Sequence, residues 1–198
     1  MRDIVSDAAA DLNRVVKINE ENKKVVQISS EVNQVALNAM LTAKRSGEKS
    51  RGFGVVSSEL RVFSGKLEHF MIDLEAPIFE LLKGVSQLLR QAQVQHHFVK
   101  AMNGSDSAKR LLTPVLARKE AEMAIGGERV KRDWCRLAML LKRALQLCET
   151  GGALSRSAKI EAVYGGDMTA SLKQVSNQIE RTVESILSIL KALRTEMC

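Results

Sequence analysis

The sequence predicts an all-α protein, and three observations lead to that prediction. Apolar residues recur at spacings of three and four over most of the chain, and no stretch alternates as a half-buried strand would. The 198 residues include two prolines and 4% aromatic residues, a composition typical of long helices. Two such segments are joined by only four residues, 47–50. We therefore expect a long antiparallel helical hairpin, a coiled coil, followed by further C-terminal helices.

Residues 2–46 carry a heptad repeat sustained over six repeats, the period that winds helices into a left-handed coiled coil. One line of the seam consists of Ile4, Asp11, Ile18, Val25, Val32 and Ala39, and the other of Ala8, Val15, Asn22, Ser29, Ala36 and Ala43. Because the second line is mostly small residues, we expect a close partner helix.

The turn at 47–50 has the glycine that such a reversal needs. Gly47 can end the first helix, because glycine adopts the left-handed conformation without a steric penalty. Gly52 and Gly54 open the return helix, where the missing Cβ lets a neighbouring helix approach closely.

The return helix has an apolar series that continues past a proline, from Phe53, Val56, Leu60, Phe63, Leu67, Phe70 and Leu74 to Ile78, Leu81, Val85, Leu88 and Ala92. Pro77 removes a backbone donor, so it predicts either a kink in one helix or a boundary between two. We favour the kink. The helix is expected to end near Asn103.

The C-terminal half contains further helical stripes separated by paired glycines. Turns are expected at 150–152 and 165–166. These signals predict a signalling hairpin over 1–103, with its tip at 47–50, and a C-terminal helical region over 104–198 that can serve as a sensory or dimerisation module.

Two helices alone bury too little surface to be stable in water, so the apolar stripe of the hairpin must be covered by two more helices. Two arrangements provide them. Either the helices of the C-terminal region complete a four-helix bundle within the chain, or a dimer partner supplies them.

Composition and short motifs argue against several classes of function. The net charge of +7 is spread along the chain without interleaved aromatic residues, which argues against nucleic acid. No apolar run is long enough for a transmembrane segment, and the N-terminal residues lack the order of a signal peptide, so we expect a cytoplasmic protein. No nucleophile motif, phosphate-binding loop or paired carboxylates are found, so we expect neither an enzyme nor a cofactor.

Metal binding and disulfides are not expected either. The three cysteines are an odd number without paired spacing, and we expect Cys135 and Cys148 to be small core residues. His96 and His97 are adjacent, so on a helix they point about 100° apart and do not chelate one ion. Together with His69 they are expected to be solvated or partly packed helix residues.

The stretch around the turn resembles the signalling tip of bacterial chemoreceptors, the methyl-accepting chemotaxis proteins. The resemblance spans roughly residues 27–68. The positions that match the tip pattern are Leu37, Asn38, Ala39, Ala43, Arg45, Gly47, Glu48, Arg51, Gly52, Phe53, Val55 and Val56.

The resemblance implies a soluble signal-transduction protein whose tip binds and regulates a chemotaxis histidine kinase and its coupling protein. It implies that Arg45, Glu48, Arg51, Phe53 and Val55 carry these contacts, with Phe53 exposed. Leu37 and Asn38 would support the inner packing. It also implies a homodimer that supplies the other two helices, by which we favour the dimeric bundle, and larger receptor clusters.

Four residues depart from the family pattern: Ser30, Gln34, Thr42 and Ser50. Thr42 replaces a carboxylate that could pair with an arginine of a neighbouring chain. These departures leave open a structural or adaptor coiled-coil protein without kinase control. A ligand sensor built in the C-terminal helices is a third alternative.

Overall fold

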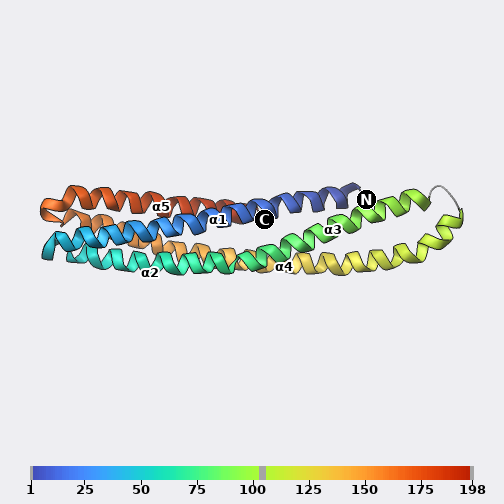
Figure 1. Cartoon of the computed structure of the whole chain (residues 1–198), viewed down its shortest axis with the longest axis horizontal. Helices are drawn as coiled ribbons and strands as arrows, with labels where there is room; N and C mark the ends of the chain where they lie inside the picture. Colours follow the sequence, from blue (N-terminus) through green and yellow to red (C-terminus); the bar gives the residue numbers. More distant parts are fainter. Residues whose placement is uncertain (1, 103–105, 197–198) are drawn as a thin grey trace. The chain divides into compact units, whose positions relative to one another are not determined.

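The computed structural model describes residues 2–102 and 106–196, with side chains from residue 8 onward. Within these ranges the chain is helical and contains no strand, which confirms the all-α prediction (Figure 1). The elements in chain order are α1 (Arg2–Arg45), the 3₁₀ helix η1 (Gly47–Ser50), α2 (Arg51–Asp73), α3 (Glu75–Met102), α4 (Asp106–Val163), the 3₁₀ helix η2 (Gly166–Met168) and α5 (Thr169–Thr195).

The chain forms two compact units. Unit 1 comprises Met1–Asn19 and Ala76–Leu137, and unit 2 comprises Glu20–Glu75 and Ala138–Cys198. Both α1 and α4 therefore contribute to both units. This structural division differs from the one expected between residues 103 and 104, and the functional division of the chain into a hairpin and a C-terminal module stays a prediction.

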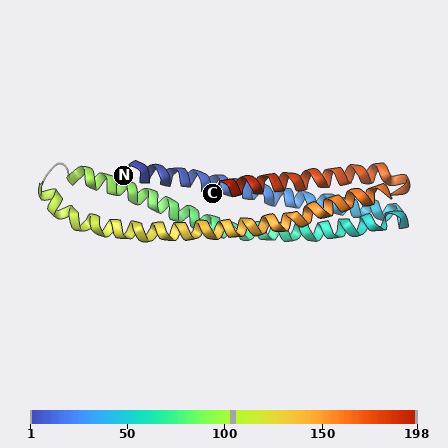
Figure 2. The same cartoon turned by 180° about the vertical axis from the view of Figure 1, so that it is seen from behind.

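Unit 2 is built from four helical segments of a single chain, which lie side by side in the views of Figures 1 and 2. Asn22 of α1 donates a hydrogen bond to the backbone oxygen of Met71 in α2 over 3.0 Å. Lys159 of α4 forms an ion pair with Glu180 of α5. Of the two arrangements, the structure contains the one in which the bundle is completed within the chain.

The predicted seam of α1 is the face that α1 buries. Over residues 15–43 each position of the two heptad lines is buried, including the polar Asn22 and Ser29. Asp11 is only partly buried, and Ile4 lies outside the residues whose side chains are described. Ser64 of α2 donates a hydrogen bond to the backbone oxygen of Ser29, so buried polar groups link α1 to α2.

Pro77 leads to a boundary between two helices rather than the favoured kink in one. The helix α2 ends at Asp73, and α3 begins at Glu75 after the single residue Leu74. The proline has no N–H for the oxygen four residues earlier, so the hydrogen-bond ladder is interrupted there. The apolar face nevertheless continues through the break without a slip, at Leu67, Met71, Leu74, Ile78, Leu81 and Val85.

The expected turn at 150–152 is wrong, because α4 runs unbroken from Asp106 to Val163. Gly151 is buried in the interior of the helix, and the ring of Phe63 from α2 occupies the space that a Cβ there would need. The glycine therefore serves a close approach of two helices and does not reverse the chain.

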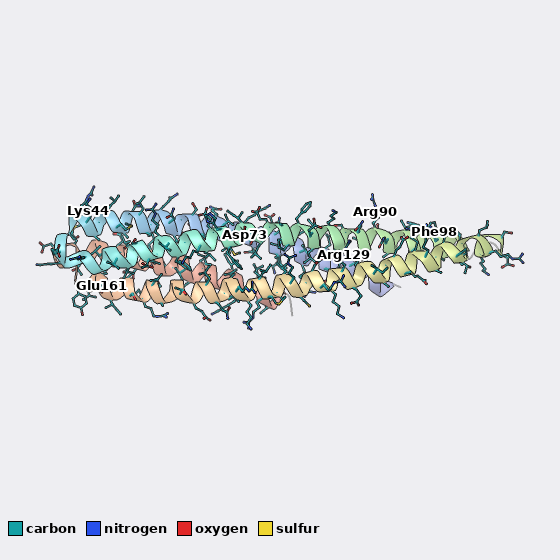
Figure 3. The ribbon with its side chains drawn as sticks, turned by 90° about the horizontal axis from the view of Figure 1, so that it is seen from below. Lys44, Asp73, Arg90, Phe98, Arg129 and Glu161 are labelled. Carbon is teal, nitrogen blue, oxygen red and sulfur yellow. The ribbon has the colours of Figure 1, made fainter. Side chains whose placement is uncertain are left out.

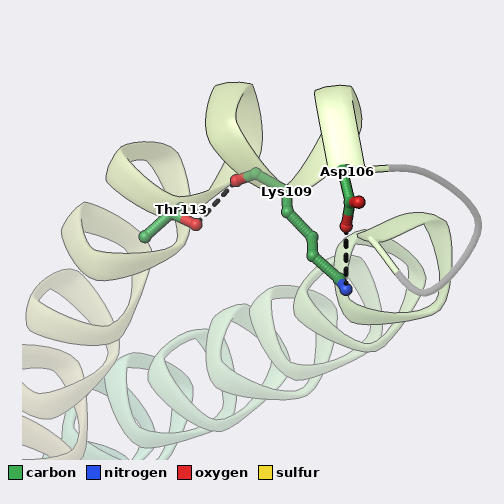
Figure 4. Close-up of polar contacts among 3 residues, drawn as sticks. All are labelled: Asp106, Lys109 and Thr113. Atoms are coloured by element: carbon green, nitrogen blue, oxygen red, sulfur yellow. Dashed lines mark hydrogen bonds and ion pairs between the residues drawn. The ribbon is translucent and has the colours of Figure 1, made fainter.

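The start of α4 is consistent with the expected end of the preceding helix. The helix α3 ends at Met102 and α4 begins at Asp106, while Asn103 lies outside the described residues. Lys109 pairs with Asp106 over 3.3 Å, and the hydroxyl of Thr113 donates to the backbone oxygen of Lys109 over 2.6 Å (Figure 4). Pro114 follows directly and is accommodated inside the helix.

The expected turn at 165–166 is confirmed. Gly166 has a φ of 58°, in the left-handed region that favours glycine, and η2 leads from it into α5. Among the described residues no helix combines the length and apolarity needed to cross a membrane.

Candidate partner-binding site at the turn between α1 and α2

The turn is closed as the sequence predicts. Gly47 has a φ of 69°. The N–H of Ser46, just before it, donates to the oxygens of Thr42 and Ala43 over 3.2 and 3.1 Å. Two of the last carbonyls of α1 are thus satisfied, and four residues of 3₁₀ helix reverse the chain into α2.

A groove of about 620 Å³ lies directly at this turn. It is lined from α1, from the turn and from α2. Three of the predicted site residues, Glu48, Arg51 and Val55, line it. Met40 and Lys44, which are not among the predicted site residues, line it from α1 and lie one turn apart on that helix.

The charged side chains around the turn are open to solvent. Glu48 and Arg51 keep 90% and 81% of their side-chain surface exposed, although they approach to 3.8 Å. An ion pair so exposed contributes little free energy, so both groups remain available to a partner. Arg45 and Lys49 are exposed as well. Figure 3 shows Lys44 of α1 and Glu161 of α4 at the same end of unit 2, near its two turns.

Three expectations about these residues are wrong. Phe53 has no exposed surface, because it begins the buried face of α2 that continues through Ser57 and Leu60. Leu37 is 45% exposed, and Asn38 is also exposed. They follow the buried Ala36 by one and two residues, and each step along a helix turns the side chain by about 100°, away from the seam.

The second turn of unit 2 lies against the first. A Cβ on Gly166 would lie 3.0 Å from the Cδ of Lys49, and the carboxylate of Glu161 fills the space beside Gly52. This confirms that Gly52 permits a close approach, whereas Gly54 meets only the Cβ of Ala43 at an ordinary 3.6 Å. The end of α4 adds the exposed Ile160 and Val163 to this end of unit 2, and the exposed Tyr164 follows directly after the helix.

The remaining chemistry-bearing residues do not form a second site. In the ranges that the structure describes, no group of three or more His, Cys, Asp or Glu side chains could hold a metal ion. His69, His96 and His97 are exposed. Cys148 is buried as expected, but Cys135 is exposed, so its expected place in the core is wrong.

Comparison with known proteins gives similarity over part of the chain. The chain is 30% identical over 107 residues to the methyl-accepting chemotaxis protein McpG of Pseudomonas putida, covering 54% of this chain and 17% of that protein. It is 28% identical over 107 residues to the methyl-accepting chemotaxis protein PctB of Pseudomonas aeruginosa, with the same coverage of 54% and 17%.

A third relative is the toxin coregulated pilus biosynthesis protein I of Vibrio cholerae, 39% identical over 69 residues that make up 35% of this chain and 11% of that protein. The chain thus spans less than a fifth of the length of these relatives. No family model and no solved structure matches it. Over about half its length, the chain is similar to methyl-accepting chemotaxis proteins.

Proposed function

We propose that this protein is a non-enzymatic, chemoreceptor-like signalling protein that binds a chemotaxis histidine kinase and its coupling protein at the turn between α1 and α2. The observation that carries the proposal is the groove at that turn, where Glu48, Arg51 and Val55 stand together and open to solvent. The similarity to methyl-accepting chemotaxis proteins supports it.

The proposed contact surface combines an apolar centre with charged neighbours. Val55 is 59% exposed and lies in the groove, and Leu37 is 45% exposed on the adjoining helix. Arg45, Glu48 and Arg51 supply charge, and Asn38 supplies a polar edge. Arginine is enriched among the residues that dominate binding energy, and such residues cluster near the centre of an interface. Phe53 acts indirectly in this proposal, by fixing the backbone of α2 from inside.

Signalling would consist of a change in helix packing that reaches the turn. A ligand or partner shifts such an equilibrium only by binding one arrangement more tightly than the other. The core of unit 2 contains buried polar groups, and the side-chain oxygens of Ser50 and Ser155 have no hydrogen-bond partner among the described residues. A buried polar group without a partner costs free energy, so it reduces the free-energy advantage of this helix packing over a slightly different one.

The proposal includes a cytoplasmic location and a homodimer. Unit 2 does not require that homodimer to bury its seam, since its four segments come from one chain. A dimer contact would therefore add to the bundle of unit 2 and would not complete it.

One observation favours the second candidate, a structural or adaptor protein without kinase control. The hydroxyl of Thr42 donates to the backbone oxygen of Asn38 over 2.9 Å, so this side chain is turned onto its own helix. A carboxylate at that position could instead pair with an arginine of another chain. Binding of the kinase distinguishes the two candidates.

The test is co-purification of the full chain with a chemotaxis kinase and coupling protein. Wild type is expected to retain both, and Val55→Asp and Arg51→Ala are expected to weaken retention at least about tenfold, since they alter the centre of the surface. Val62→Asp and Arg61→Ala are matched controls, because Val62 and Arg61 are exposed on the same helix but do not line the groove. Equal retention by all five proteins, or by none, would refute the proposal.

A further inference from the structure

Unit 1 contains an apolar groove that nothing in the proposed function uses. Its volume is about 750 Å³, and it is lined by α1, α3 and α4. Val85 and Val130 at the groove are almost fully buried, and Leu88 is half-buried. Trp134, the one tryptophan of the sequence, lines it, with the guanidinium of Arg14 5.3 Å from its ring centre.

Within the described ranges unit 1 has three helical segments, one fewer than unit 2, and all three line the groove. Two glycines draw α3 and α4 together: a Cβ on Gly84 would lie 2.9 Å from Val130, and one on Gly126 would lie 3.0 Å from Leu88. Gly127 also lines the groove, but a Cβ there would have no atom within 4 Å. At Gly127 the backbone of α4 therefore borders empty space.

The groove has the shape that a neighbouring helix fills. Its α4 lining recurs at steps of three and four, at Glu120, Met123, Ala124, Gly127, Val130, Lys131, Trp134 and Cys135. This is the spacing of a seam that receives a packed helix, and the small residues Ala124 and Gly127 leave room for the knobs of that helix. The same helix buries a continuing stripe in unit 2, at Leu141, Leu145 and Cys148.

The charges along α4 indicate which helix fits. Glu120 and Lys131 are both exposed and both line the groove, eleven residues apart, which is about 16 Å along a helix. Glu120 accepts a hydrogen bond from Gln95 over 3.1 Å, and Lys131 has no ion pair within the described part of the chain. The midpoint between them lies between Ile125 and Gly126, next to Gly127. A second α4 placed antiparallel and centred there would set each Glu120 opposite the other copy's Lys131.

We propose that unit 1 is an interface between two copies of this chain, related by a twofold axis that passes between Ile125 and Gly126, with the two α4 helices antiparallel. Such a surface is self-complementary, as a twofold contact requires. Each α4 lies in the groove of the other copy, and Gly127 permits the close crossing. This inference gives an interface to the homodimer that the proposed function includes, and it does not depend on kinase binding at the turn.

Sedimentation velocity of the full chain over a range of concentrations tests the interface. Wild type is expected to be a dimer, with Trp134 emission changing as it dissociates. Gly127→Leu is expected to abolish the dimer, because its side chain fills the crossing point. Gly65→Leu, at a helical glycine of unit 2 that also borders open space, is the control and is expected to dimerise as wild type does.

Charge reversal tests the antiparallel order. Lys131→Glu and Glu120→Lys each create two like-charge contacts and are expected to raise the dissociation constant about tenfold. The double variant restores opposite charges and is expected to recover most of the affinity. Circular dichroism of each variant checks that the helices are retained. A wild type that stays monomeric, a Gly127→Leu variant that still dimerises, or a double variant no better than the single ones would overturn the proposal.

Cys135 gives an independent readout. In the antiparallel arrangement the two Cys135 residues are separated by about 28 Å along the helices, so mild oxidation of a Cys198→Ser variant is expected to leave the chains unlinked. Rapid disulfide linkage through Cys135 would indicate a parallel contact and would refute the proposed axis. A small molecule that co-purifies in the groove of a monomer would assign the groove to a ligand instead, and would refute it too.

Discussion

The ring of Phe63 in α2 lies where a side chain on Gly151 of α4 would begin. Phe63 is 3% exposed, so the ring has no free space into which it can retreat. The glycine thus sets how closely these two helices of unit 2 pack. It also explains how two adjacent glycines, a common turn signal, can lie inside a continuous helix.

Gly151→Ala is expected to destabilise the protein by about 1–3 kcal/mol, because the added methyl group displaces the Phe63 ring in a packed core. The measurement is urea unfolding followed by circular dichroism. Gly152→Ala is the control: its Cβ would lie 3.6 Å from the end of Arg156, an ordinary contact, so better helix propensity is expected to stabilise the protein by about 0.5–1 kcal/mol. A stabilised Gly151→Ala would contradict the packing described here.

Gly47→Ala is expected to cost about 1–2 kcal/mol, because any residue with a Cβ is strained at a φ of 69°. A Cβ at this position meets no atom within 4 Å, so backbone strain alone accounts for the loss. Thermal unfolding measures it. Gly47→Asn is expected to lose less, since asparagine tolerates the left-handed region better. Equal stability of all three proteins would show that the turn is not held in this conformation.

Two buried serines of unit 2 are expected to respond oppositely to replacement by alanine. The hydroxyl of Ser155 has no hydrogen-bond partner in the described structure, so Ser155→Ala is expected to stabilise the protein by about 1 kcal/mol. Ser64 donates to Ser29 across two helices, so Ser64→Ala is expected to destabilise it by about 1 kcal/mol. Parallel urea titrations compare the two, and a change of the same sign in both would be inconsistent with these contacts.

Cys148 is expected to resist modification and to make stability depend on pH. Burial raises the pKa of its thiol to about 12. The unfolded chain loses this proton near pH 8.5 and the folded chain does not, so the contribution of Cys148 is fully present below that pH and falls by about 1.4 kcal/mol per pH unit until about pH 12.

The measurement is the difference in unfolding free energy between wild type and Cys148→Val from pH 7 to pH 10.5, where the valine variant is expected to lose less. In a background that combines Cys198→Ser with Gly127→Leu, which is expected to be monomeric, the exposed Cys135 is expected to react with a thiol reagent at pH 8 in the folded protein, and Cys148 only in urea. Fast reaction of both thiols without urea would show that Cys148 is accessible.

Part of the candidate site could have been read more fully from the sequence. Phe53 opens the same apolar series as Leu60 and Leu67, and that periodicity already places it inside the bundle. The exposure of Leu37 follows likewise from its position beside Ala36 of the seam. In contrast, the contacts of Lys49 with Gly166 and of Glu161 with Gly52 join segments more than a hundred residues apart, and no local pattern indicates them.

The sequence by itself determined the all-α class, the buried face of α1 and the reversal at Gly47, because heptad spacing and the conformational freedom of glycine act over a few residues. Only the tertiary structure decided that α4 runs straight through Gly151, and that α4 and α5 supply the other two helices of unit 2. Both outcomes depend on close packing between distant segments. Local propensity does not encode that packing, since the same glycine can end a helix or admit a neighbouring ring.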